Sequence, residues 1–158
     1  MTLDAVQQGL IEALQRNART TNRRLAELVG LAPSSSLQRV RDLEERGVIT
    51  GYHAEIDLAA LRRNVQAMVF VRLAPADAAT VDAFFETVSA FPETIAVSLL
   101  SGAEDAVVHV AVGDVQQLRR VVLEKISAMA CVSEERTSLV FEHRRSAVIG
   151  LLDEHTAD

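Results

Sequence analysis

The spacing of apolar residues changes along this chain, from a helical period before Gly47 to a strand-rich pattern after residue 65. The helical period predicts three short helices, of which the first covers 4–15. The second begins after the capping run Thr20-Thr21-Asn22 and ends at Gly30. The third begins with Pro33 in its first turn and ends at Gly47. Their expected apolar stripes are Val6, Leu10, Ile11 and Leu14; Leu25, Ala26, Leu28 and Val29; and Leu37, Val40 and Leu43.

The second and third helices are separated only by Gly30-Leu31-Ala32. Two helices joined by so short a turn, with a third packed against them, predict a helix-turn-helix, although small helical bundles show similar spacing. The following Val48–Tyr52 is expected to form a strand or wing. We therefore assign 1–52 to a winged helix-turn-helix domain and 53–64 to a linker.

The remaining residues, 65–158, predict a second domain of mixed α and β structure. Strands are expected over 65–73, 95–100, 105–112 and 132–141, and helices over 81–91 and 115–129. The order β-α-β-β-α-β is that of a ferredoxin-like fold, so the whole chain belongs to the α+β class. A closing helix is expected over 143–152.

The third expected strand is apolar on both faces. Ala106, Val108 and Val110 alternate with Val107 and His109, and strand residues point to opposite faces in turn. Two helices cover only one face of a four-stranded sheet, so we expect the other face to pack on a second copy of the chain.

The charge is unevenly distributed. The net charge is −6, but residues 1–52 hold seven Arg and six acids, whereas 53–158 hold nine basic and sixteen acidic residues. We therefore expect any nucleic acid to bind the N-terminal part. No apolar run is long enough to span a membrane, and the start lacks a signal-peptide pattern, which together predict a cytoplasmic protein without a membrane partner.

Nothing in the chain predicts catalysis, a metal site or a cofactor. Cys131 is the only cysteine, which excludes an intramolecular disulfide and a multi-cysteine zinc site. The four histidines, at 53, 109, 143 and 155, lack ligand spacing, and His109 is interpreted as an interface residue. No phosphate-binding glycine loop or nucleophile elbow occurs.

Three stretches of the sequence resemble the Lrp/AsnC family of feast/famine regulators. They are Leu25-Ala26-Glu27-Leu28-Val29-Gly30-Leu31-Ala32-Pro33-Ser34, then Leu37-Gln38-Arg39-Val40-Arg41-Asp42-Leu43-Glu44, and Gly47-Val48-Ile49-Thr50-Gly51-Tyr52. The later Leu100-Ser101-Gly102 and the element order extend the resemblance over nearly the whole chain. It implies a transcription regulator that binds double-stranded DNA, dimerises through its sheets, often assembles into octamers, and responds to a small molecule, usually an amino acid.

The exposed face of the third helix carries the candidate DNA contacts. A recognition helix presents its N-terminal residues to base edges in the major groove, and hydroxyl, amide and guanidinium groups all bond base edges. We assign base contacts to Ser34, Ser35, Gln38 and Arg39, and phosphate contacts to Arg41, Arg23 and Arg24. A solvated helix face is the alternative for each of them.

The resemblance places the effector at the loop between the two central strands. Gly102 permits a close backbone approach or a tight turn, and Glu104 and Asp105 offer carboxylates to an ammonium group. The family's usual Gly-Asp-x-Asp reads Gly102-Ala103-Glu104-Asp105 here, Gln7 replaces a usual second aspartate, and Ala32 replaces a usual capping serine. The expected effector contacts are Leu100, Ser101, Gly102, Ala103, Glu104, Asp105, Thr137 and Ser138.

Two alternative functions are compatible with the same architecture. One is an octameric protein that wraps DNA without sensing an effector, which the altered loop leaves open. The other is an enzyme, because the architecture also resembles that of sirohaem decarboxylases. An enzyme of that class should have a degraded recognition helix and paired His or Arg groups, whereas this recognition helix is intact and the histidines are dispersed.

Overall fold

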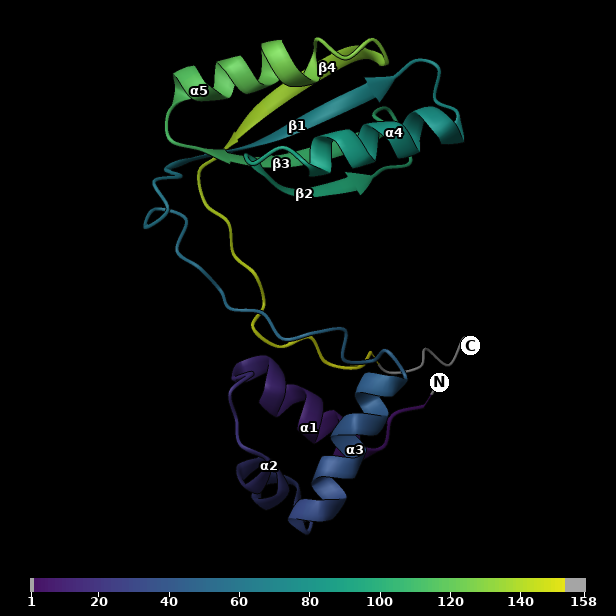
Figure 1. Ribbon diagram of the computed structural model, residues 1–158, viewed down its shortest axis with the longest axis vertical. Coiled ribbons are helices and arrows are strands. Elements are labelled where there is room, and N and C mark those ends of the chain that lie inside the picture. The colour runs from purple at the N-terminus through teal and green to yellow at the C-terminus, as the bar shows by residue number, and fades with distance from the viewer. Residues whose placement is uncertain (1, 153–158) are drawn as a thin grey trace. The chain divides into compact units, whose positions relative to one another are not determined.

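The computed structural model describes residues 2–152 and divides into two compact units. One unit holds the residues up to Glu55 together with the described segment from Arg144 onward. The other is Ile56–His143. The chain passes between the units twice (Figure 1), once at Glu55–Ile56 and once at His143–Arg144. Among the described residues, no helix has the length and apolar character needed to cross a membrane.

The described part of the first unit contains three helices, as the apolar period predicts. They are α1 (Ala5–Arg16), α2 (Asn22–Val29) and α3 (Pro33–Glu45). Gly30 ends α2 with φ +70°, a left-handed conformation in which a Cβ is costly. Only Gly30, Leu31 and Ala32 lie between α2 and α3, and the two helices form the expected helix-turn-helix. Their shared core with α1 consists of Leu10, Leu14, Leu25 and Val40.

The buried stripe of α3 differs from the expected one. Ser36 is fully buried, and Val40 and Leu43 are buried with it, whereas 40% of Leu37 is exposed. The spacing 36, 40 and 43 follows the helical period as well as the expected 37, 40 and 43 does. Leu28 on α2 is also exposed rather than buried. Because serine is polar, the apolar pattern of the sequence did not indicate that Ser36 lies in the core.

Two expected segments have no regular secondary structure. Residues 48–52, expected as a strand or wing, form no strand, and the Tyr52 hydroxyl donates a 2.7 Å hydrogen bond to Glu44 Oε1 on α3. Burial, together with Glu44, raises the pKa of Tyr52 to about 12. Residues 143–152 form no helix, because the backbone N–H and carbonyl of Ile149 bond the Gln15 amide at 2.8 and 3.1 Å instead of neighbouring turns.

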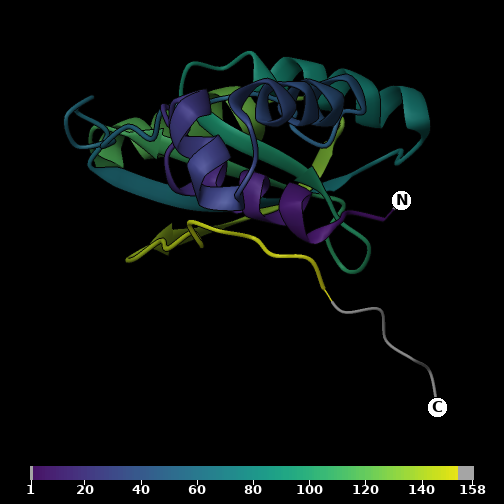
Figure 2. The ribbon, with the colours of Figure 1, turned by 90° about the horizontal axis from the view of Figure 1, so that it is seen from below.

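The second unit has the expected βαββαβ order and forms one antiparallel sheet in the order β2-β3-β1-β4. The expected helix over 115–129 ends as a π-helical turn at Ile126. Figure 2 shows the sheet with α4 lying along it. The elements are β1 (Val65–Leu73), α4 (Ala78–Ser89), β2 (Thr94–Leu99), β3 (Ala106–Val112), α5 (Val115–Arg120), η1 (Val121–Ile126) and β4 (Val132–Val140).

The helices cover one face of the sheet and leave the other without a helical layer. Val69 and Val108 pair across β1 and β3 on the covered face and are fully buried, with Phe84 of α4 and Ile126 of η1 in the same core. The paired residues Met68 and His109 lie on the opposite face. We call this second surface the open face; the packing of a second copy on it stays a prediction.

Candidate functional site

The start of α3 is held by a side chain of α2 and not by a cap of its own. Ala32 precedes the helix and gives no side-chain cap, and Pro33 occupies its first turn. The Asn22 side chain donates a 2.7 Å hydrogen bond to the Pro33 carbonyl, so the first turn of α2 is joined to the first turn of α3. Thr21 caps α2 by accepting a 3.3 Å bond from the Arg24 N–H.

The four residues that we expected to contact bases lie together. Ser34, Ser35, Gln38 and Arg39 line one shallow hollow, with Asp42 and Gln7. Gln38 donates a 2.8 Å hydrogen bond to Asp42 Oδ1. A row of hydroxyl, amide and guanidinium groups along the N-terminal half of a helix has the chemistry that base edges in a major groove require.

Arg39 forms an ion pair that the sequence did not indicate. Its guanidinium bonds Asp4 Oδ2, at the start of α1. Asp4 is also the N-cap of α1, where Oδ1 accepts a 2.8 Å bond from the Gln7 N–H. The Gln7 N–H first, and then the Arg39 guanidinium, lowers the pKa of Asp4. The capping pattern of Asp4 is visible in the sequence, but its pairing with a residue on α3 is not.

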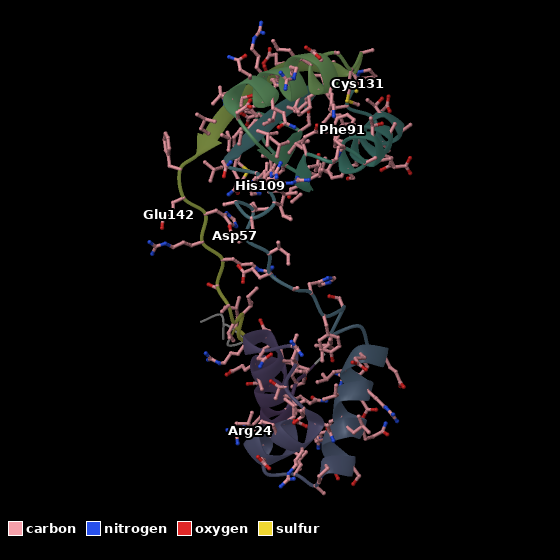
Figure 3. All side chains as sticks on the ribbon, turned by 60° about the vertical axis from the view of Figure 1, so that its left-hand side comes forward. Arg24, Asp57, Phe91, His109, Cys131 and Glu142 are labelled. Carbon is pink, nitrogen blue, oxygen red and sulfur yellow. The ribbon has the colours of Figure 1, made fainter. Side chains whose placement is uncertain are left out.

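The three arginines expected at phosphates are all exposed. Arg23 and Arg24 each bond Glu27 of their own helix at 3.3 Å, and Arg24 lies at the outer surface of the helical unit (Figure 3). Arg41 is exposed on α3. Exposed pairs of this kind contribute little to stability, so Arg23 and Arg24 are available to a polyanion.

The loop between β2 and β3 is a closed hairpin over 100–105. The Leu100 N–H bonds the Asp105 carbonyl at 2.8 Å, and Ser101 lies in the loop between them. Gly102 has φ +143°, a conformation that side-chain-bearing residues rarely adopt. Gly102 is therefore required by the turn itself.

Two arginines from neighbouring strands hold this hairpin. Arg72 on β1 donates two hydrogen bonds, at 3.0 and 2.6 Å, to the Ala103 carbonyl. Arg136 on β4 bonds Glu104 at 2.9 Å and lies 4.2 Å from the centre of the Phe70 ring. Sequence reasoning did not identify either arginine. Their pairing follows from strand register, which no local pattern encodes.

Asp105 is tied to the sheet by both its backbone and its side chain. Its N–H bonds the Val71 carbonyl at 2.9 Å. Its Oδ2 accepts a 2.8 Å bond from the Leu73 N–H, at the point where the β1–β4 register is interrupted. The Asp105 carboxylate thus satisfies a backbone donor that the strand ladder leaves without a partner.

Thr137 and Ser138 lie on different faces of β4. Ser138 pairs with Met68 on the open face and accepts a 3.4 Å bond from Arg136. Thr137 pairs with Val69 on the covered face and bonds Glu135 at 3.0 Å. The structure therefore brings Ser138, but not Thr137, to the surface that carries Arg136 and Glu104.

The remaining chemistry-bearing residues lie apart from these two sites. His109 lies on the open face (Figure 3), where its Nε2 is 3.0 Å from Gln66 Oε1 and its ring is 5.5 Å from that of His143. Burial, and then the charge of His143, lowers the pKa of His109. Cys131 is half-buried. Within residues 2–152 no three His, Cys, Asp or Glu side chains are grouped as metal ligands.

Comparison with known proteins identifies similar domains at both ends of the chain. Residues 3–50 match a family model described as winged helix-turn-helix DNA-binding, and residues 66–147 match one described as Lrp/AsnC ligand binding domain. The chain is 39% identical to the HTH-type transcriptional regulator AldR of Mycolicibacterium smegmatis, over 92% of this chain and 85% of AldR. It is 32% identical to the leucine-responsive regulatory protein of Rhizobium meliloti, over 92% and 93%.

A solved structure is similar over almost the full length. It is a transcriptional regulator of Neisseria meningitidis in complex with L-Met, with a TM-score of 0.87 and 27% identity. The match covers 98% of this chain and 99% of that one. The similarity therefore extends over both units of the chain, the helix-turn-helix and the antiparallel sheet.

Proposed function

The chain belongs to the Lrp/AsnC family of transcription regulators, and from that premise we propose that it controls transcription in the cytoplasm in response to an amino acid bound at the hairpin 100–105. It is a DNA-binding regulator with a ligand-binding domain and not an enzyme. The row of polar side chains in the hollow of α3 carries the DNA part of the proposal.

In this proposal α3 is the recognition helix. Ser34, Ser35, Gln38 and Arg39 contact base edges, since all four line one hollow near the N-terminal half of the helix. The exposed Arg23, Arg24 and Arg41 contact phosphates and fix the position of the head on double-stranded DNA without reading sequence.

Substitution of two arginines on one helix tests these roles. Arg39→Ala should weaken binding to a selected duplex by about 1–3 kcal/mol and relax the preference at one base pair. Arg41→Ala should weaken all duplexes alike and reduce the slope of log K against log salt by about one. Titration of selected and scrambled duplexes at several salt concentrations measures both. An equal loss on both duplexes for Arg39→Ala would contradict base reading by Arg39.

The effector proposal rests on the hairpin and on the L-Met complex of the Neisseria relative. One Asp105 oxygen accepts from the Leu73 N–H, which leaves the other for an ammonium group. Backbone N–H groups of the hairpin loop donate to the carboxylate of the bound amino acid. The proposed contacts come from the hairpin residues Leu100, Ser101, Gly102, Ala103, Glu104 and Asp105, with Ser138 of β4. Thr137 is left out of the proposed contacts, because it pairs with Val69 on the covered face.

Calorimetry with a panel of amino acids tests the effector. At least one should bind the wild-type protein, and Asp105→Asn should weaken that binding, because an amide attracts an ammonium group less strongly than a carboxylate. DNA affinity without effector should be unchanged in this variant. If no amino acid binds the wild-type protein, an effector-independent DNA-wrapping role replaces the proposal.

We also propose that the chain forms a homodimer that assembles further, towards an octamer. The open face carries the half-buried apolar side chains of Met68, Phe70 and Val107. No helix within residues 2–152 covers them, and a monomer would leave them partly in water. Light scattering at micromolar concentration should give a dimer or a multiple of it. A monodisperse monomer would contradict both the dimer and a symmetric two-half-site mode of DNA binding.

A further inference from the structure

Asp4 connects the start of α1 to the recognition surface of α3. One carboxylate oxygen closes a capping box: Oδ1 accepts from the Gln7 N–H at 2.8 Å, and the Asp4 N–H bonds Gln7 Oε1 at 3.1 Å. The other oxygen bonds the Arg39 guanidinium, 35 residues further along the chain. The carboxylate is thus fixed on one helix while it contacts a side chain on another.

The two helices that carry this pair are packed against each other. Leu10 and Leu14 of α1 pack against Val40, the residue that follows Arg39, in the core of the helical unit. The Asp4 carboxylate is therefore set relative to α3 by packing as well as by its cap. An arginine side chain has several rotatable bonds, and fixing such a side chain costs conformational entropy.

The pair leaves most of the guanidinium available. A guanidinium has five N–H donors, and the bond to Asp4 Oδ2 comes from one terminal nitrogen, Nη1. Arg39 also borders the hollow lined by Ser34, Ser35 and Gln38, and 38% of its side chain is exposed. A bidentate contact with guanine needs only two N–H groups.

We propose that Asp4 is a positioning residue for sequence recognition, which holds Arg39 so that its remaining N–H groups meet a guanine edge; this inference rests on the proposed base contact of Arg39. Because half of the Asp4 side chain and more than a third of Arg39 are exposed, their pair contributes little to folding. The pair instead reduces the conformational entropy that the Arg39 side chain loses when it binds a base.

Asp4→Asn tests this role, because asparagine caps a helix as well as aspartate does but carries no charge. A duplex selected by the wild-type protein from a randomised pool is the specific probe, and a scrambled duplex of equal composition is the non-specific one. The ratio of the two affinities should fall about threefold to tenfold, the cost of ordering one long side chain on binding. The melting temperature should stay close to that of the wild-type protein.

Asp77→Asn is the matched control, since Asp77 caps α4 by accepting a 2.8 Å bond from the Thr80 N–H. It should keep the wild-type ratio of affinities. The double variant Asp4→Asn with Arg39→Ala should show the same ratio as Arg39→Ala alone, because Asp4 acts only through Arg39.

Three outcomes would overturn the positioning role. They are that Asp4→Asn retains the wild-type ratio, that it strengthens binding to both duplexes equally through the loss of a negative charge, or that it adds its full effect to that of Arg39→Ala. If Arg39→Ala itself keeps the ratio, the base contact fails, and the role of Asp4 fails with it. A loss in Arg39→Ala without one in Asp4→Asn rejects the positioning role alone.

Discussion

Replacement of Asp105 should destabilise the sheet, because its carboxylate has a structural partner. Leu73 is 4% exposed, and its N–H bonds Asp105 Oδ2 at 2.8 Å where the β1–β4 ladder is irregular. Asp105→Ala removes the acceptor and leaves a buried donor without one, at a cost of about 1–3 kcal/mol. Asp105→Asn keeps an oxygen that accepts from the same N–H, so it should lose less than half as much.

Scanning calorimetry of the full chain measures the difference. For a domain of this size each kcal/mol shifts the melting temperature by about 4–8 °C, so Asp105→Ala should melt at least about 4 °C lower. Glu134→Ala is a surface control, since Glu134 makes only an exposed 3.6 Å pair with Arg72. The reasoning is refuted if Asp105→Ala melts with the wild type, or if Asp105→Asn loses as much as Asp105→Ala.

Three further predictions follow from the backbone, the open face and the core. Gly30→Ala should cost about 1–2 kcal/mol, because φ is +70° and no atom lies near an added Cβ; chemical denaturation of the full chain measures it, and an unchanged midpoint would contradict the backbone argument. The pKa of His109 is lowered from 6.5 in the folded protein, so as the pH falls this residue is protonated in the unfolded chain before it is protonated in the folded one. The free energy of unfolding should therefore decrease below about pH 6.5 in the wild type, and this decrease should be smaller in His109→Gln. Phe84→Ala, at a fully buried position, should cost about 3–5 kcal/mol by the same denaturation assay, and a loss below 1 kcal/mol would mean that the core closes over the cavity.

The order and type of the main elements could be predicted from the sequence because each buries an apolar stripe of its own period. All four expected strands and all five main helices form within a few residues of their expected positions. The predictions failed where contacts with residues distant in the sequence determine the local structure. Ser36 is buried although it is polar, and residues 143–152 satisfy backbone groups through Gln15 rather than through helical turns.

The same distinction between local pattern and distant partners applies to the candidate sites. Ser34 and Gln38 were found on one surface because a helix places residues four apart on the same face. The partners of the site residues were not found, since each is distant in the chain: Asp4 lies 35 residues from Arg39, and Leu73 lies 32 from Asp105. Contacts of that kind depend on packing and register, for which a single sequence carries no periodic signal.

The way the hairpin is held limits how an effector can act on this chain. The Ala103 carbonyl, the Glu104 carboxylate and the Asp105 carboxylate all have partners on β1 or β4. A ligand at the hairpin therefore meets a preorganised surface and gains little by reshaping it. A ligand shifts an equilibrium only through different affinities for the two states, so the states that it distinguishes must differ outside the hairpin. If the dimers assemble further, as we propose, the two states are alternative assemblies of dimers, and a change in their packing would alter the spacing of the DNA-binding heads.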